Sequence, residues 1–229
     1  MKILALETSA GPASCAVVED GRVLASAYIN TPLTHSQTLM PMVESMLQNA
    51  GLNFSEMDRV AITAGPGSFT GVRIGVAAVK GLAFPADKPC VGVSTLAAIA
   101  RNTQGVGFDG VVCAAMDARC RQVYTACFEN GERLTEDEAI SLDDLKNRLI
   151  SYKKPIFLLG DGAKLCYTAF VDDIPDLHLA PEHLRYQHAV GVAMEAALCE
   201  TVTAEALQPL YLRLPQAERE LRARTNQSV

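Results

Sequence analysis

The alternation of apolar and polar positions over residues 1–30 predicts three short strands. The last two apolar runs are separated by Asp20-Gly21. This dipeptide is a strong signal for a two-residue hairpin, because a type I′ turn requires positive φ at both central residues. The strands are expected over residues 3–6, 14–19 and 22–29.

Helical and strand patterns then alternate. Residues 34–37 resemble a capping box, and an apolar stripe at helical spacing continues from Leu39 to a stop at Gly51. Pro41 inside this segment predicts a kink or a later start. The elements expected next are a strand over 60–63, a helix over 69–84, a strand over 90–93 and a helix from Ser94 to about residue 101.

The pattern restarts after a glycine-rich linker at residues 103–110. When the sequence is aligned with itself at an offset of 110 residues, Glu7 aligns with Asp117. A second hairpin signal, Asn130-Gly131, aligns with Asp20-Gly21. The repeated unit therefore predicts a duplicated lobe. The further elements expected are a helix from residue 142, a strand over 156–159, a turn over 160–162 and a helix over 187–200.

Two such units describe an α/β protein with duplicated βββαβα lobes, each a mixed sheet with helices. This arrangement is typical of the actin-like architecture. We expect an N-terminal lobe over residues 1–106 and a C-terminal lobe over residues 107–229. The tail after residue 209 is a candidate to pack back on the first lobe.

Composition excludes several classes of protein. With 229 residues, of which 49% are apolar, the chain can bury a large core, which argues against disorder. A net charge of −6 argues against a protein that binds nucleic acid by itself. Glu7 interrupts the first apolar run and Lys80 the longest one, so we expect neither a secretory signal nor a membrane helix. The seven cysteines lack C-x-x-C spacing and mostly have apolar neighbours, as reduced cysteines in a cytosolic protein do.

The segment with the most specific chemistry is VAITAGPGSFTGVRIG, residues 60–75. A strand continues into Gly65-Pro-Gly67 and a helix follows at once, which allows close backbone approach and favours an anion at the helix start. A tight structural turn explains the same residues, and no lysine is present for a P-loop. Gly71 and Gly75 permit close helix approach, either inside the domain or at a partner interface.

Five motifs together resemble the bacterial TsaB (YeaZ) family over nearly the whole chain. They are ILALETS near the N-terminus, AGPGSFTGVRIG, GVSTL at 92–96, MDAR at 116–119 and PLYLR at 209–213. The resemblance implies an actin-like fold and a part in tRNA modification. With TsaD and TsaE, the family is expected to support transfer of a threonylcarbamoyl group from threonylcarbamoyl-adenylate to N6 of adenosine 37, in tRNAs reading codons that start with A.

The resemblance also implies partners and surfaces. TsaD and TsaE are the expected partners, with a homodimer when the chain is alone, tRNA contact only through the assembled complex, and a cytoplasmic location away from membranes. The expected partner interface comprises Leu39, Val43, Met46, Leu47, Phe69, Gly71, Val72, Gly75 and Val79. A remnant of a nucleotide or anion loop is expected at Glu7, Thr8, Ser9, Gly65, Gly67, Ser68, Asp117 and Arg119.

The resemblance associates chemistry with an H-x-x-x-H metal pair in the TsaD relative, and here those positions are Thr95 and Ile99. We therefore expect no catalytic residue and no cofactor or metal of this chain's own, with ATP and Mg²⁺ used by the complex and a metal ion held by TsaD. Glu7 and Asp117 either hold Mg²⁺ through water or cap nearby backbone amides. The alternative function is an actin-like ATPase or kinase, or a glycoprotease-type peptidase, acting alone. The mixed-charge tail over residues 213–224 predicts a solvated helix.

Overall fold

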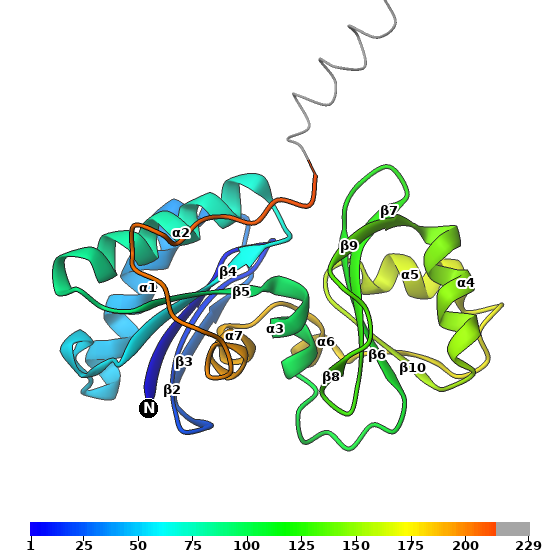
Figure 1. The fold of residues 1–229 in the computed structure, drawn as a ribbon, viewed down its shortest axis with the longest axis horizontal. Coiled ribbons are helices and arrows are strands. Elements are labelled where there is room, and N and C mark those ends of the chain that lie inside the picture. The colour runs from blue at the N-terminus through cyan, green and yellow to red at the C-terminus, as the bar shows by residue number, and fades with distance from the viewer. Residues whose placement is uncertain (214–229) are drawn as a thin grey trace, which may run out of the picture.

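Two mixed sheets, one at the centre of each lobe, organise the chain (Figure 1). The computed structural model describes residues 1–213, so the charged tail beyond Arg213 lies outside the described residues. The first sheet has the order β3-β2-β1-β4-β5, with β1 antiparallel to β2 and parallel to β4. The elements of this lobe are β1 (Lys2–Glu7), β2 (Ala13–Glu19), β3 (Arg22–Ile29), α1 (His35–Ala50), η1 (Phe54–Glu56), β4 (Arg59–Gly65), α2 (Phe69–Ala83), η2 (Phe84–Ala86), β5 (Cys90–Ser94) and α3 (Thr95–Arg101).

The second sheet repeats this order. Its path is β11-β10-β6-β7-β8, β9 pairs with β7, and β6 is antiparallel to β7 and parallel to β10. In both lobes, then, the first strand lies between the second strand and the parallel strand that follows the first long helix, so the predicted duplication holds at the level of topology. The elements are β6 (Val111–Asp117), β7 (Gln122–Glu129), β8 (Glu132–Arg133), β9 (Glu138–Ser141), α4 (Leu142–Tyr152), β10 (Ile156–Leu159), α5 (Ala163–Phe170), β11 (Leu177–Leu179), α6 (Glu182–Arg185) and α7 (Ala189–Ala196).

Local sequence signals explain most element ends. Both hairpin dipeptides adopt positive φ, with values of 48° and 82° at Asp20 and Gly21. The hydroxyls of Ser94 and Ser141 cap α3 and α4 by accepting backbone N–H groups. Helix α1 differs from the prediction, because Thr34 makes no capping hydrogen bond through its side chain and the helix begins before its internal proline.

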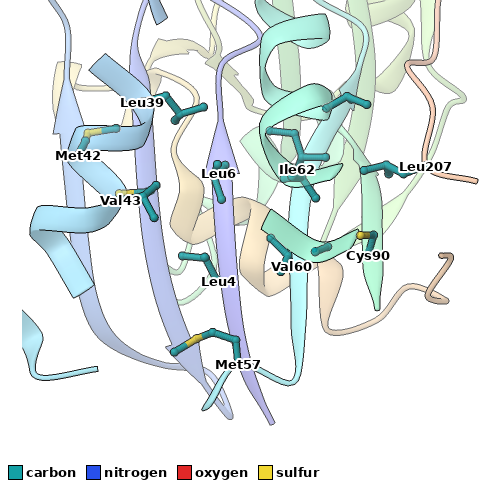
Figure 2. Packing of buried hydrophobic residues seen from close by; sticks show 14 of the residues in the cluster. Leu4, Leu6, Leu39, Met42, Val43, Met57, Val60, Ile62, Cys90 and Leu207 are labelled. Atoms are coloured by element: carbon teal, nitrogen blue, oxygen red, sulfur yellow. The ribbon is translucent and has the colours of Figure 1, made fainter. Parts of the chain in front are cut away.

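The core of the first lobe lies between its sheet and helices α1 and α2. Figure 2 shows Leu39 and Val43 of α1 directed toward Leu6 of β1, while Ile62 lies on the neighbouring strand β4. Apolar residues three and four apart on each helix form the buried stripe. By length and composition alone, the stretch Phe69–Ala86 would suffice to cross a membrane, yet α2 packs its valines on the sheet as a core helix does.

The last described helix corrects the expected boundary between the lobes. Helix α7 packs against the opposite face of the first sheet, not against the second sheet (Figure 1). The Ser14 hydroxyl of β2 accepts the N–H of Ala189 at 2.9 Å, and the Arg59 guanidinium of β4 donates to the carbonyl of Ala196 at 3.1 Å. Helix α7 and the segment after it therefore belong to the first lobe and not to the expected C-terminal lobe, because the small residues of α7 fit the apolar face of the first sheet.

The chain after α7 runs along the first lobe as a strap, which we define as residues 202–213. It pairs with the edge strand through a bridge between Val202 and Cys90, and it buries Leu207 in the core of this lobe. The N–H of Leu210 donates to the carbonyl of Ala64 at 2.6 Å. The strap thus reaches the carboxyl end of β4, beside the space between the lobes.

Candidate functional site

The turn after β1 directs its polar side chains inward. Glu7 ends the strand, and Oε1 of its carboxyl group accepts the backbone N–H of Ser9. The Thr8 hydroxyl donates a 2.8 Å hydrogen bond to the carbonyl of Gly71, in the first turn of α2. Glu7, Thr8 and Ser9 are all fully buried. The turn therefore joins β1 to α2, and Glu7 caps a backbone amide, as one of the two alternatives predicted.

The Glu7 carboxyl group lies in an environment that favours its neutral form. Burial raises the pKa of Glu7 and the nearby Asp161 raises it further, whereas the backbone N–H that Ser9 donates lowers it. Within residues 1–213, Oε2 of Glu7 has no hydrogen-bond partner, and neither do the hydroxyls of Ser9 and Thr63. A charged carboxylate would be costly in such a place, so the arrangement suits a carboxylic acid.

The glycine-rich turn between β4 and α2 fits against the chain's own backbone. Gly65 adopts a φ of 134°, and a Cβ there would lie 2.1 Å from the carbonyl oxygen of Leu210 in the strap. A Cβ on Gly67 would lie 2.6 Å from the carbonyl oxygen of Ser9. The N–H of Ser68 donates to this same carbonyl at 2.7 Å, and the Ser68 hydroxyl caps α2. The geometry is that of a tight structural turn, the second explanation that the sequence allowed.

The turn between β6 and β7 is the second-lobe equivalent of the turn after β1, and it exposes charged side chains instead of burying them. One carboxylate oxygen of Asp117 accepts the N–H of Arg119 at 2.8 Å, and the other pairs with the Arg119 guanidinium at 3.3 Å. Arg119, Cys120 and Arg121 have successive φ values of 65°, 53° and 55°. Three consecutive side chains in the left-handed region are unfavourable, so this hairpin is locally strained.

These three turns and the strap enclose a cleft of about 480 Å³ between the lobes. The cleft brings together Ser9, Gly67, Ser68, Asp117 and Arg119 from the predicted loop, whereas Glu7, Thr8 and Gly65 lie behind its wall. Phe69 of the predicted interface also lines it. The remaining lining residues are Ala10, Gly11, Pro66, Met116, Ala118, Tyr124, Asp161, Leu210, Tyr211, Leu212 and Arg213.

Sequence reasoning did not select Asp161, which lines the cleft, or Gln187, which contacts Asp161. The Asp161 carboxylate accepts a 2.7 Å hydrogen bond from the Gln187 amide. Burial raises the pKa of Asp161, the Gln187 hydrogen bond lowers it, and the nearby Asp117 raises it. In the duplicated unit, the turn over residues 160–162 corresponds to the glycine-rich turn between β4 and α2. This correspondence is the sequence signal that identifies Asp161. No comparable signal marks Gln187.

The residues assigned to the partner interface mostly point into the first lobe. Leu39 and Val43 belong to its buried core, as Figure 2 shows. A Cβ on Gly75 would lie 2.3 Å from the Thr8 hydroxyl, so the glycines serve packing inside the lobe. A partner on these helices must therefore contact their outward face, which corrects the residues expected there. Those that the lobe itself buries are Leu39, Val43, Met46, Gly71, Val72, Gly75 and Val79, while Leu47 and Phe69 are half-buried.

Glu7 and Asp117, the two carboxylates considered for Mg²⁺, are largely engaged by the chain's own groups and do not fit a resident ion. Glu7 and Asp117 each give one oxygen to a backbone N–H, and the second oxygen of Asp117 is paired with Arg119. Across residues 1–213, no three His, Cys, Asp or Glu side chains gather as metal ligands would. Thr95 and Ile99 are fully buried.

Comparisons with known proteins agree with this architecture. Residues 30–221 match the family model described as "TsaD: tRNA N6-adenosine threonylcarbamoyltransferase". The tRNA threonylcarbamoyladenosine biosynthesis protein TsaB of Bacillus subtilis is 32% identical over 226 residues, covering 95% of this chain and 96% of that protein. The protein of the same name from Haemophilus influenzae is 39% identical over 228 residues, covering 93% and 94%.

Solved structures agree as well. YeaZ from Pseudomonas aeruginosa is 34% identical, with a TM-score of 0.76 over 92% of this chain and 99% of that one. Ethanolamine utilization protein EutJ from Carboxydothermus hydrogenoformans is 13% identical, with a TM-score of 0.54 over 85% and 90%, and shares the fold alone. The actin-like α/β fold expected from the sequence is confirmed.

Proposed function

Because the chain belongs to the TsaB family of tRNA threonylcarbamoyladenosine biosynthesis proteins, we propose that it is the non-catalytic partner subunit of the transferase. In this proposal it acts with TsaD and TsaE, and it is required to transfer the threonylcarbamoyl group from threonylcarbamoyl-adenylate to N6 of adenosine 37. The substrates are tRNAs that read codons starting with A. A part in forming threonylcarbamoyladenosine follows from the family alone, and the subunit role is the further step.

One observation carries the non-catalytic role. The two carboxylates and the glycine turn predicted for a nucleotide loop are engaged by the chain itself. Glu7 and Asp117 accept backbone N–H groups, and the backbone of Leu210 fills the space beside Gly65. A cleft whose carboxylate Asp117 is paired with the chain's own Arg119, and whose glycine turn is covered by the strap, offers little to a reacting substrate. We therefore propose that the chain has no cofactor of its own, while the complex uses ATP and Mg²⁺ and TsaD holds a metal ion.

The outward faces of α1 and α2 support a partner surface. On α2, Ala77 and Gly81 are exposed with Ile74 half-buried beside them, and Phe84, directly after the helix, is 64% exposed. Met40 is exposed on α1. Small and apolar residues on an outward face permit close packing of a partner's helices. We propose that TsaD docks here in the cytoplasm, that a second copy takes the same surface when TsaD is absent, and that tRNA is bound only by the assembled complex.

Reconstitution with and without the chain tests the subunit role. tRNA, ATP, Mg²⁺, the adenylate-forming synthase, TsaD and TsaE are combined, and modified adenosine 37 is measured by mass spectrometry. The proposal requires the modification to fall to background when the chain is omitted. Undiminished modification without it would overturn the proposal. ATP hydrolysis or peptide cleavage by the chain alone would favour the alternative function of an independent enzyme.

A matched pair of variants tests the docking surface. Ala77→Arg places a long charged side chain on the exposed face of α2, whereas Ala169→Arg makes the same change on the exposed face of α5 in the second lobe. Co-purification with TsaD should be lost for Ala77→Arg and kept for Ala169→Arg, with both proteins folded by circular dichroism. Retention of TsaD by both variants would place the partner elsewhere.

A further inference from the structure

We propose that the rim of the interlobe cleft binds single-stranded RNA, with arginines from both lobes holding phosphate groups and aromatic rings stacking on a base. This inference rests on the proposed function for its choice of tRNA as the RNA. The two sides of the rim come from segments far apart in the sequence, the start of α2 with the strap on one side and the β6–β7 hairpin on the other.

On the first-lobe side, an arginine lies against two aromatic rings. The guanidinium carbon of Arg73 is 3.8 Å from the centre of the Phe69 ring, and its Nε donates to the Tyr211 hydroxyl at 2.9 Å. The rings of Phe69 and Tyr211 are stacked, with centroids 4.6 Å apart. Arg73 is exposed and has five N–H donors, of which this contact uses one. The guanidinium is thus held in place with donors left for a phosphate.

Two further arginines lie at the β6–β7 hairpin, one reaching it from the strap and one belonging to it, and each is anchored by a single contact. The guanidinium of Arg213 donates to the carbonyl of Ala118 at 3.1 Å, and the side chain of Arg119 is 80% exposed while it pairs with Asp117. Arg119 belongs to the three-residue left-handed run, which also holds the exposed Arg121. Strain of this kind persists where the surroundings impose it, often at functional sites. Here it presents arginines at the mouth of the cleft.

The charge at the rim differs in sign from that of the chain. The whole sequence has a net charge of −6. Among the described residues that line the cleft, the charged ones are Arg119, Arg213, Asp117 and Asp161, and Arg73 lies beside the lining residue Phe69. Arg119 neutralises Asp117, and the Asp161 carboxylate accepts a hydrogen bond from the Gln187 amide. An anion approaching the rim therefore meets a locally positive surface.

This combination of groups suits single-stranded RNA. Phosphates pair with arginine, and unstacked bases stack on aromatic or guanidinium planes, which a duplex does not expose. Tyr211 is 41% exposed and Tyr124 also lines the cleft. A cavity of about 480 Å³ is in the range of small-ligand sites, so it has room for one base but not for a helix. The acidic remainder of the chain explains why such a rim acts only beside a partner that also contacts the RNA.

A charge-reversal pair tests the proposal in the complex with TsaD. Arg73→Glu with Arg119→Glu changes one residue on each side of the rim. The control pair, Arg22→Glu with Lys153→Glu, makes the same charge change at exposed positions away from the cleft. Binding of a fluorescent, unmodified tRNA transcript is measured by anisotropy over a range of salt concentrations. The rim pair should weaken binding about tenfold or more and reduce the salt slope by about 2, whereas the control pair changes affinity less than about twofold.

Three outcomes would overturn the proposal. Equal losses for both pairs would show an effect of overall charge, and no loss for either would exclude the rim. Displacement of tRNA by micromolar AMP would assign the cleft to a free nucleotide. A milder pair, Arg73→Gln with Arg119→Gln, should show a smaller loss of the same kind if the reversed pair folds poorly. Omission of the chain from the modification assay is scored separately, so failure of the subunit role and failure of the RNA rim remain distinguishable.

Discussion

The two lobes share one strand order, but the acidic residue that ends the first strand has a different environment in each lobe. In each lobe this carboxylate accepts the N–H two residues further on, Ser9 for Glu7 and Arg119 for Asp117. Glu7 is fully buried with one oxygen unpartnered among the described residues, whereas Asp117 is half-buried and paired with an exposed arginine. A repeated backbone feature thus has two different electrostatic roles.

The lengths of the two turns explain the difference. Glu7 pairs with Ser14 across the first hairpin, and Asp117 pairs with Val123 across the second, so the second connection is one residue shorter. The longer turn folds inward and is tied to α2 by the Thr8 hydroxyl. The shorter one closes through left-handed residues and stays exposed. The first lobe uses its turn for packing, and the second uses its turn to present charge.

The largest effect is expected where the first turn meets α2. A Cβ at position 71 would lie 2.1 Å from the backbone oxygen of Thr8, so Gly71→Ala should lower the free energy of unfolding by about 3 kcal/mol. Gly81→Ala on the same helix has nothing within 4 Å and should raise stability by up to about 1 kcal/mol. Urea denaturation of both variants measures the difference. Equal stabilities would show that the α2 contact adapts freely.

A second comparison sets Glu7→Gln against Asp117→Asn. The raised pKa of Glu7 means that the folded state keeps a proton that the unfolded state has lost, so this residue's contribution to stability falls as pH rises from about 4.5. Glu7→Gln removes the titration and supplies an amide N–H to the nearby hydroxyls. The variant should therefore be more stable than the wild type at neutral pH, with a gap that grows toward higher pH and vanishes below about 4.5.

Denaturant midpoints measured from pH 4 to pH 9 check the Glu7 prediction. Asp117→Asn loses an exposed ion pair and should change stability by less than about 1 kcal/mol. If Glu7→Gln were less stable than the wild type throughout this range, the buried carboxyl would be a charged and stabilising group instead.

Local signals in the sequence were sufficient for most of the fold. The Asp20-Gly21 and Asn130-Gly131 turns, the Ser94 cap and the buried strands are each determined by a few neighbouring residues. The 110-residue repeat revealed the equivalence of Glu7 and Asp117 without a structure. These features need no information about distant parts of the chain.

The errors have one physical cause, which is packing between distant segments. The sequence of α7 shows that it is apolar but not which sheet it covers. The same limit applies to Gly71 and Gly75, whose spacing suits any close neighbour, while the structure shows the neighbour to be the β1–β2 turn. Burial of Glu7 and the hydrogen bond from Gln187 to Asp161 likewise depend on how the lobes meet.

A smaller effect is expected from the strain in the second turn. Cys120 is exposed with a φ of 53°, a conformation that glycine adopts at little cost. Cys120→Gly should raise the free energy of unfolding by about 1 kcal/mol relative to Cys120→Ala, which removes the thiol but keeps the strain. Thermal unfolding of the two variants compares them directly. Equal stability would mean that the backbone relaxes out of the left-handed region once the side chain is shortened.

The smallest effects distinguish helix caps that form from one that does not. Ser94 and Ser141 each accept a backbone N–H at the start of α3 and α4, so replacing either by alanine should cost about 1 kcal/mol. Thr34 occupies the same position before α1 without a capping bond. Thr34→Ala should therefore lower the free energy of unfolding by only a few tenths of the cost expected at Ser94 or Ser141. Chemical denaturation resolves this difference. A full loss at Thr34 would show that its hydroxyl caps α1 in solution, and the capping box read from the sequence would then be right.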